Sequence, residues 1–465
     1  MTLLLPVAHA LVARKDLPIP AWLFAWGASI VLIVSFFALS VGWRKPRLER
    51  ERWRPLGAQV SRVLLGLPMQ LICGALGVLL LGFSVYAGLH GTEAPDRNFS
   101  LTFLFVTCWL GFALFSVVLG DVFRPFNPWR TIGRVVGGAF AAVAAQPAAH
   151  LPYPRRLGRW PAAVGLLAFV WLEVVYGVNG GVAVGLSPRS AALAALVYSL
   201  YTLAMMAVFG VEEWCRKGEV FSVYYGMLSQ LGSFGVKGGR LGRRLPLSAA
   251  TQWATVPGSA AVVIASIAST SFDGAQEGAF KGGIVQVFEW LVDAGFSRSG
   301  ALRLSDTLFM LLCFAGVGLV YLIGVRGMST VRGAPPLAKL RSGFAHTLVP
   351  IAFAYLVAHY FSLFVFQEQA QFTYLLSNPL GTHGTDLFGT ASSGIDFKVL
   401  SANAIWYVQV AALVLGHVTG LVLAHDRATA YWGDYRQAAR SQYWMLAVMV
   451  AFTCFGLYLL SVANS

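Results

Sequence analysis

The stretch GFAHTLVPIAFAYLVAHYFSLFVFQEQAQ, residues 343–371, decides the fold class of this chain. It is apolar for longer than the roughly 20 residues that an α-helix needs to cross the hydrocarbon core of a bilayer. Similar runs recur along all 465 residues, of which 57% are hydrophobic and 12% are charged, and the mean hydropathy is +0.67. Soluble domains carry about twice that share of charge. The sequence therefore predicts an all-α, polytopic membrane protein.

The apolar runs predict about ten spanning helices in a single transmembrane helical bundle, residues 20–465, which follows an external N-terminal segment, residues 1–19. A weaker run, 131–146, is expected to lie at the membrane interface. We expect the spanning helices near residues 20–42, 64–88, 100–120, 160–178, 190–210, 255–271, 305–325, 344–366, 403–424 and 442–462.

The positive charges alternate between successive loops. Loop 43–63 is crowded with Arg and Lys, whereas loop 89–99 holds the single cation Arg97. Four later loops repeat the basic pattern, and by the positive-inside rule all five basic loops are cytoplasmic, so that both termini lie outside. The net charge of +14 is therefore a topology signal. It does not indicate nucleic-acid binding, which would need one basic soluble face with interleaved aromatic residues.

Motifs that identify several enzyme classes are missing from the sequence. The five cysteines form no CxxC pair, so neither a zinc ribbon nor a disulfide framework is indicated. We also find no Walker loop, GxSxG elbow or HExxH helix. The sequence therefore gives no support to an ATP-driven protein or a serine hydrolase.

Ionisable side chains within the apolar runs are the functional candidates, because desolvating such groups is costly. His346 and His359 are separated by about 20 Å of helical rise, so they cannot share a metal ion. Two levels follow. The outer level holds Glu173, Asp273, Asp306, His359, Glu368, His383 and Asp386. The middle and inner level holds Asp121, Glu212, His346, His417, His425 and Asp426.

Carboxylate and imidazole groups from different helices at similar depth are ligands for a divalent ion such as Zn²⁺ or Cu²⁺. We predict a metal site with His359, Glu173 and Asp273 as ligands and His417 as a fourth candidate. Glu173 and Asp273 are also the predicted catalytic residues. The predicted substrate-binding residues are Tyr176, Tyr360 and Asp386, and the further candidates are His9, His346, His425 and Glu368.

Several of these residues have a structural alternative. Asp273 precedes a glycine and could cap a turn. His417 lies between Gly416 and Gly420, a small-xxx-small pair that lets two helices approach, and could form a buried interhelical hydrogen bond. His425 and Asp426 could anchor a helix end at the interface.

Four further segments have open readings. The stretches 120–130 and 210–232 mix aromatic and charged residues in the manner of interfacial or re-entrant helices. The stretch 376–397, rich in Gly, Ser and Thr, could be a lid over an outer cavity or an ordinary external loop. The N-terminal run is short for a signal peptide, but cleavage after Ala8 would give His9 a free amine beside its imidazole, a pair that binds copper.

Six segments together resemble the bacterial fenitrothion hydrolases, a family of polytopic membrane proteins. The likeness spans nearly the whole chain, although the segment before His9 is shorter than in that family. The resemblance implies a protein of the bacterial cytoplasmic membrane that hydrolyses lipophilic organophosphorus triesters and releases a nitrophenol. The segments are AHALVARKDLPIPAWLFAW, FVWLEVVY, SFDG, AHTLVPIAFAYLVAHYFSLFVFQ, IWYVQVAALVLGHVTGLVLAHDRA and RSQYWMLAVMV.

Two other functions use the same residues. A proton- or metal-coupled transporter would use intramembrane Glu, Asp and His as a path, and two polar levels suit such a path. Haem ligation between His346 and His417 is the third reading. Besides the lipid bilayer and a lipophilic substrate, a partner subunit is left open.

Overall fold

The structure, a computed structural model, describes residues 21–50, 52–145, 149–276 and 278–463. It is mostly helical, and within the described residues seven helical stretches are long and apolar enough to cross a membrane. Many of their apolar side chains point away from the protein, as Leu79, Leu200 and Leu312 do. An apolar outer surface of this kind fits contact with lipid. The seven stretches are Ala58–His90, Phe99–Leu119, Pro188–Phe209, Arg298–Met328, Leu337–Ser377, Ala402–Trp432 and Tyr435–Tyr458.

The other three predicted spans are also helical, as α1 (Ala21–Gly42), α8 (Trp160–Val174) and α12 (Ser259–Gln276). The apolar part of α1 and the whole of α8 are shorter than the seven stretches. Helix α12 is rich in Ala and Ser, and nearly all of its side chains are buried. It therefore lies inside the protein and not at the lipid surface.

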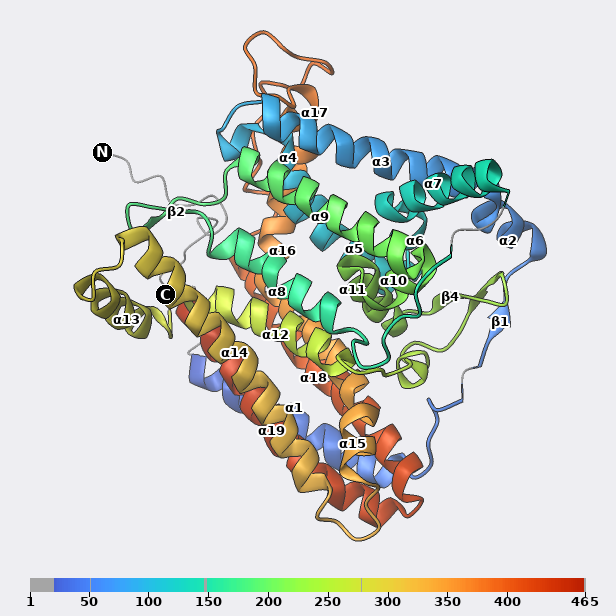
Figure 1. Cartoon of the computed structure of the whole chain (residues 1–465). Helices are drawn as coiled ribbons and strands as arrows, with labels where there is room; N and C mark the ends of the chain where they lie inside the picture. Colours follow the sequence, from blue (N-terminus) through green and yellow to red (C-terminus); the bar gives the residue numbers. More distant parts are fainter. Residues whose placement is uncertain (1–20, 51, 146–148, 277, 464–465) are drawn as a thin grey trace.

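Helix α16 (Val349–Phe372) runs through the middle of the bundle (Figure 1). It packs against α12, α18 (Ala402–Trp432) and the π-helix η2 (Thr102–Gly111). Helix α19 (Tyr435–Ala463) packs on α18, and α1 and α14 (Arg298–Met328) pack on α19. The α16–α18 contact is close because a Cβ built on Gly416 would lie 2.2 Å from the Cβ of Ala354. The predicted close approach at the small-xxx-small pair is thus confirmed.

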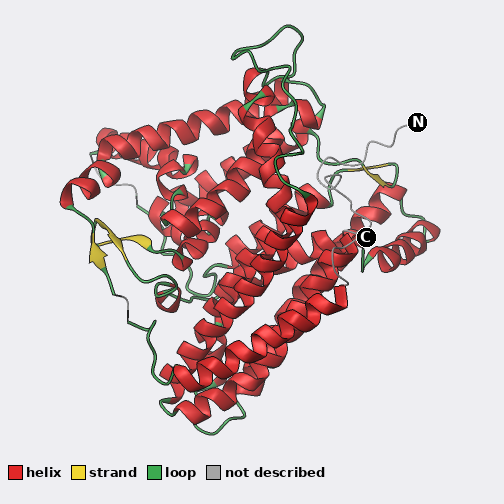
Figure 2. Ribbon diagram, turned by 180° about the vertical axis from the view of Figure 1, so that it is seen from behind, coloured by secondary structure: helices red, strands yellow, loops and turns green. Residues whose placement is uncertain are grey.

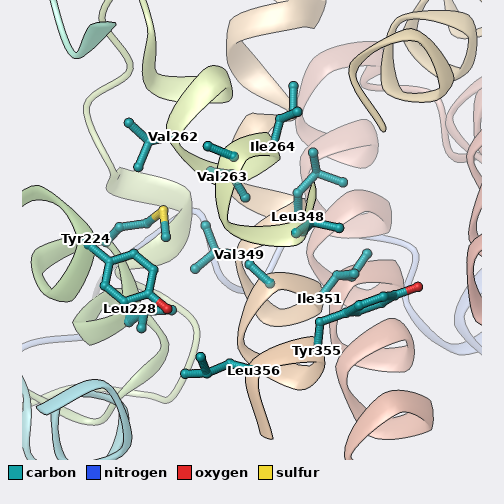
Figure 3. Close-up of a cluster of buried hydrophobic side chains, with 14 of the residues drawn as sticks. Tyr224, Leu228, Val262, Val263, Ile264, Leu348, Val349, Ile351, Tyr355 and Leu356 are labelled. Carbon is teal, nitrogen blue, oxygen red and sulfur yellow. The ribbon is translucent and has the colours of Figure 1, made fainter. Parts of the chain in front are cut away.

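The core between α16 and two other helices, α11 (Val220–Leu228) and α12, is apolar (Figure 3). Tyr224 and Leu228 of α11 face Val262 and Val263 of α12 and Val349 of α16. The tyrosine ring is 1% exposed. Helix α11 belongs to the stretch that the sequence left between interfacial and re-entrant, and its buried side chains place it within the bundle.

The remaining helices either belong to the seven long apolar stretches or connect them. In α7 (Pro128–Ala144) the large apolar side chains Val135, Val136, Phe140 and Val143 are exposed, as expected for an interfacial helix. The others are α2 (Ala58–Leu65), α3 (Leu67–His90), α4 (Phe99–Leu101), α5 (Phe112–Leu119), α6 (Phe123–Phe126), α9 (Pro188–Phe209), α10 (Val211–Lys217), α13 (Lys281–Asp293), α15 (Leu337–Gly343) and α17 (Tyr374–Ser377). The 3₁₀ turns are η1 (Pro95–Arg97), η3 (Ser229–Leu231), η4 (Ala250–Gln252) and η5 (Ala345–Leu348).

Short antiparallel strands occur between the helices (Figure 2), and the sequence analysis did not predict them. One sheet has the order β1-β5-β4, and the other pairs β2 with β3. The β2–β3 hairpin follows α8 directly, and its turn uses Gly180 and Gly181 with positive φ angles. The strands are β1 (Arg54–Pro55), β2 (Val178–Asn179), β3 (Val182–Ala183), β4 (Phe234–Lys237) and β5 (Arg240–Arg243).

Candidate functional site

Asp273 lies at the centre of the best candidate site. Its Oδ2 atom accepts two hydrogen bonds from α16, one from His359 Nε2 at 2.8 Å and one from the Tyr360 hydroxyl at 2.6 Å. The aspartate is 2% exposed, and it remains within α12, so the predicted turn cap is wrong. Because a carboxylate only accepts, His359 in this arrangement carries its proton on Nε2.

Aromatic rings enclose one side of this pair. The Trp109 ring of η2 packs edge-on against Tyr360 at 5.0 Å between ring centroids, and Phe169 of α8 packs against Trp109 at 5.4 Å. Tyr360 was predicted to bind substrate. In the structure its hydroxyl is hydrogen-bonded to Asp273, and the residue is 5% exposed. The site is therefore a polar triad within an apolar wall.

Glu173 approaches the same region from α8, which packs on α12. It is close enough to Tyr360 for their charges to interact. The sequence placed Glu173 about two turns inside a helix ending near residue 178, but α8 ends at Val174. The helix is shorter because the glycine-rich β2–β3 hairpin begins there.

The structure bears on the predicted metal site in one respect. Among the described residues, no group of three or more His, Cys, Asp and Glu side chains is placed to hold a metal ion. In the structure, Asp273 and His359 form a hydrogen-bonded pair, and Tyr360 is the third member of the cluster.

His417 does not join this cluster. Its Nδ1 atom lies 2.7 Å from the backbone oxygen of Leu413 in its own helix, and its ring packs near Tyr355 at 6.1 Å between centroids. The predicted interhelical hydrogen bond is therefore wrong, because the side chain turns back onto the preceding turn of α18. The Nε2 atom of His417 is buried and has no hydrogen-bond partner among the described residues.

His346 is buried in η5, beside Gly343 and Arg427. His417 is near Tyr355, which lies nine residues beyond His346, about 13 Å of helical rise. The two histidines are therefore at different levels, and the contacts do not support a haem held between them.

His425 and Asp426 hold the segment that follows α1. Asp426 is fully buried and accepts hydrogen bonds from Trp43 Nε1 at 2.7 Å, from the Arg47 amide at 2.6 Å and from the Leu48 amide at 3.0 Å. His425 Nε2 lies 3.0 Å from the Trp43 backbone oxygen. The anchoring alternative is thus supported, although α18 continues past these residues to Trp432.

A second polar cluster joins α7, α9 and α10–α11, and the sequence analysis missed its centre. Glu219 is fully buried and accepts hydrogen bonds from Tyr198, Asn127 and the amides of Phe221 and Ser222. Glu219 and Asn127 are also the N-caps of α11 and α7. The Asn-Pro dipeptide at 127–128 is a sequence signal for that second cap.

Charged residues flank this cluster. Glu212 pairs with Arg130 at 2.7 Å and with Arg134 at 2.7 Å. Partial burial opposes its ionisation, but the hydrogen bonds and charges of these two arginines lower the pKa of Glu212. Burial raises the pKa of Asp121 to about 6, although the Arg124 amide donates to its carboxylate.

The other predicted residues are dispersed. Asp386 lies in the 378–401 loop, where hydrogen bonds from Ser377 and the Ala391 amide fix a turn and lower its pKa. Tyr176 stacks under Arg303, and Asp306 is buried within α14. Glu368 is on α16 near Thr107. His9 lies outside the described residues.

The chain was compared with protein-family models, curated proteins and solved structures, and none matches. The resemblance to fenitrothion hydrolases therefore stays a prediction based on the six segments, and the site must be judged by its own chemistry.

Proposed function

We propose that this chain is a membrane-embedded hydrolase of lipophilic organophosphorus triesters such as fenitrothion, with the Asp273–His359–Tyr360 cluster as its site. The observation that carries the proposal is the convergence of His359 and Tyr360 on the buried Asp273. A carboxylate that orients an imidazole is a recurrent arrangement for general-base catalysis. The substrate class comes from the resemblance.

The reaction needs one proton acceptor. Water attacks phosphorus while His359 accepts its proton, a P–OH bond forms, and the bond from phosphorus to the aryl oxygen breaks. The products are the phosphorus acid diester and a nitrophenolate, which leaves without a strong general acid. Asp273 orients the imidazole and stabilises its charged form. Apolar triesters would reach the site from the bilayer.

A zinc or copper ion is part of the proposal. It would supply Lewis-acid polarisation and a bound water of lowered pKa. Asp273, His359 and Glu173 are its candidate ligands, but these described residues do not form a three-residue metal-binding group, so the reaction above is written without the ion. His417 is left out of this ligand set, because its ring is bonded to Leu413 in α18.

The proposed setting is the bacterial cytoplasmic membrane, with ten spans and both termini outside. Seven long apolar helices and three shorter or buried ones support this count. Reporter fusions after Arg54, Arg244 and Arg436 should report the cytoplasm, and fusions after Glu93 and Asp386 the periplasm.

A proton- or metal-coupled transporter is the second candidate. It is favoured by the buried ionisable residues Asp273, His417 and His346, which lie at more than one depth in the bundle. A through-path requires more than one level, whereas a single catalytic site does not.

The test uses purified protein in lipid nanodiscs and nitrophenol release from fenitrothion. Asp273→Asn and His359→Gln should each lower the rate by roughly 100-fold or more, the typical contribution of a general base. His90→Gln is the matched control, since this exposed histidine bonds to the Tyr86 backbone of its own helix and lies outside the proposed site. Bound metal is measured on the same samples.

Folded wild-type protein that releases no nitrophenol would refute the hydrolase. The transporter reading is then tested in liposomes containing a pH-sensitive dye. Proton uptake by the wild type that is lost in Asp273→Asn would support transport.

A further inference from the structure

Glu368 is a buried carboxyl group that the proposed reaction does not use. It lies on α16, nine residues beyond His359, a rise of about 13 Å. Both of its carboxylate oxygens are buried, and neither has a hydrogen-bond partner within the part of the chain that the structure describes. Asp426 and Glu219, which are also buried, have donors on both oxygens.

Two further polar groups lie near Glu368. One helical turn later on α16, Gln371 is 3% exposed, and its Oε1 is buried without a hydrogen bond among the described residues. The Thr107 hydroxyl faces Glu368 from η2; its oxygen is also buried, but it lies close enough to interact with the carboxyl group, and a hydroxyl can donate or accept. The donor described beside this buried carboxyl is therefore a single hydroxyl.

No cation offsets the carboxylate in the described structure. The titratable group that faces it from η2 is the Cys108 thiol. The 378–401 loop reaches the next residue of α16, because the side chain of Gln369 bonds to the backbone of Asp396. An ionised carboxylate at this depth, without a cation beside it, would cost several kcal/mol.

The partner element is itself unusual. Residues Thr102–Gly111 form a π-helix, and Thr107 and Cys108 lie within it. The π conformation is rare, generally limited to single turns, and concentrated at functional sites. Its occurrence opposite the one unpartnered carboxyl of α16 is a second observation, independent of the hydrogen-bond inventory.

We propose that Glu368 is a proton-binding site, whose carboxyl group carries a proton at neutral pH and donates it to an oxygen of the α16–η2 contact. The proton gives the carboxyl group an O–H that one neighbouring oxygen, Thr107 Oγ1 or Gln371 Oε1, can accept, and it removes the buried charge. This inference does not depend on the hydrolase, because it concerns a different group and a different ligand.

The experiment is chemical labelling with dicyclohexylcarbodiimide, which adds to protonated carboxyl groups in apolar surroundings and gives a stable N-acylurea. The full-length protein in nanodiscs is labelled at pH 7, and each carboxyl-containing peptide is quantified by mass spectrometry. We expect Glu368 to be labelled at least ten-fold more than the exposed Glu93, because an ordinary exposed carboxyl is protonated to well under 1% at this pH.

Two labelling outcomes would overturn the proposal. Labelling at pH 5 but not at pH 7 would show that the carboxyl is ionised at neutral pH. Labelling suppressed by sodium chloride, but not by choline chloride, would show a metal cation in place of the proton.

Stability gives a second readout that does not depend on reagent access. Glu368→Gln imitates the protonated acid, so at pH 4 it should melt within about 2 °C of the wild type, a difference well below 1 kcal/mol. The wild type should lose stability relative to this variant as the pH rises from about 4 to 7, because the unfolded chain then releases the proton that the folded state still holds. Parallel stability curves for the two proteins would contradict a bound proton.

Discussion

Asp426 and Asp273 are both buried aspartates, 0% and 2% exposed, but they have different donors. Asp426 uses both oxygens, and two of its three donors are backbone amides that cannot lose a proton at ordinary pH. Asp273 Oδ2 accepts hydrogen bonds from the side chains of His359 and Tyr360, and Gln276 Nε2 donates to Oδ1 at 3.4 Å. The fixed donors suit a structural anchor, whereas the exchangeable donors suit proton transfer.

Glu219 belongs with Asp426 in this comparison. Two amides of α11 and the side chains of Asn127 and Tyr198 supply its donors. Burial alone therefore does not identify a functional carboxylate in this protein, but the chemical nature of its donors does.

The largest expected effect is on stability at Asp426. In Asp426→Asn an amide NH₂ group replaces one acceptor and faces a backbone N–H, which should cost about 2–4 kcal/mol of unfolding free energy. Asp273→Asn should cost about 1 kcal/mol or less, because its amide oxygen can take the place of Oδ2 and keep both hydrogen bonds. Thermal unfolding in one detergent measures both variants, and equal losses would undo the comparison.

Glycine positions test the same two regions sterically. A Cβ at Gly416 would meet Ala354 Cβ at 2.2 Å and Pro350 O at 2.9 Å, so Gly416→Ala should destabilise the α16–α18 contact by about 1–3 kcal/mol. A Cβ at Gly274 would meet His359 Nδ1 at 3.5 Å, an ordinary contact. Gly274→Ala should therefore retain near wild-type stability. Melting curves decide the matter, and a larger loss at Gly274 would be inconsistent with the structure.

The carboxyls flanking the Glu219 cluster should respond to pH in opposite directions. Glu212 has a lowered pKa, so the stability that it contributes is present above the pKa of the unfolded chain and is lost as the pH falls through the folded value. Glu212→Gln should cost about 1 kcal/mol at pH 7, since Glu212 is half exposed but Arg130 is buried. At pH 3 the variant and the wild type should be alike. A cost that persists at pH 3 would contradict an ionic origin.

The sequence predicted the helices better than it predicted their ends. Every apolar run became a helix, because spanning segments must satisfy their backbone hydrogen bonds internally. Helix α8 ends early, at a glycine-rich hairpin. Helix α18 continues to Trp432, because its buried Asp426 accepts hydrogen bonds from Trp43, Arg47 and Leu48. These donors lie far away in the sequence, so the apolar pattern could not reveal them.

The candidate site was predictable only by depth. Asp273 and His359 were placed at one level from topology, and the structure brings them into contact. The depth of a residue in the membrane does not say in which direction around the helix axis its side chain points. The sequence therefore could not show that His417 turns toward Leu413 or that Tyr360 bonds to Asp273. Nor could it separate a proton-exchanging carboxylate from an anchor, because that depends on donors from other elements.

The smallest expected effect is at Asp121, and its sign is opposite to that of Glu212. Burial raises the pKa of Asp121 to about 6, so the folded protein binds this proton more tightly than the unfolded chain does. The resulting stability is complete below the unfolded value near 4 and is lost as the pH rises through about 6.

Asp121→Asn removes the penalty of ionisation while its amide oxygen can still accept from the Arg124 amide. The variant should therefore match the wild type at pH 4 and exceed it at pH 8 by about 1 kcal/mol or less, since the neighbouring arginines offset part of the burial. Melting temperatures at pH 4, 6 and 8 measure the effect, with Glu212→Gln as the control of opposite sign. If Asp121→Asn is instead less stable at pH 8, the carboxylate is held by the arginines as an anchor and belongs with Asp426.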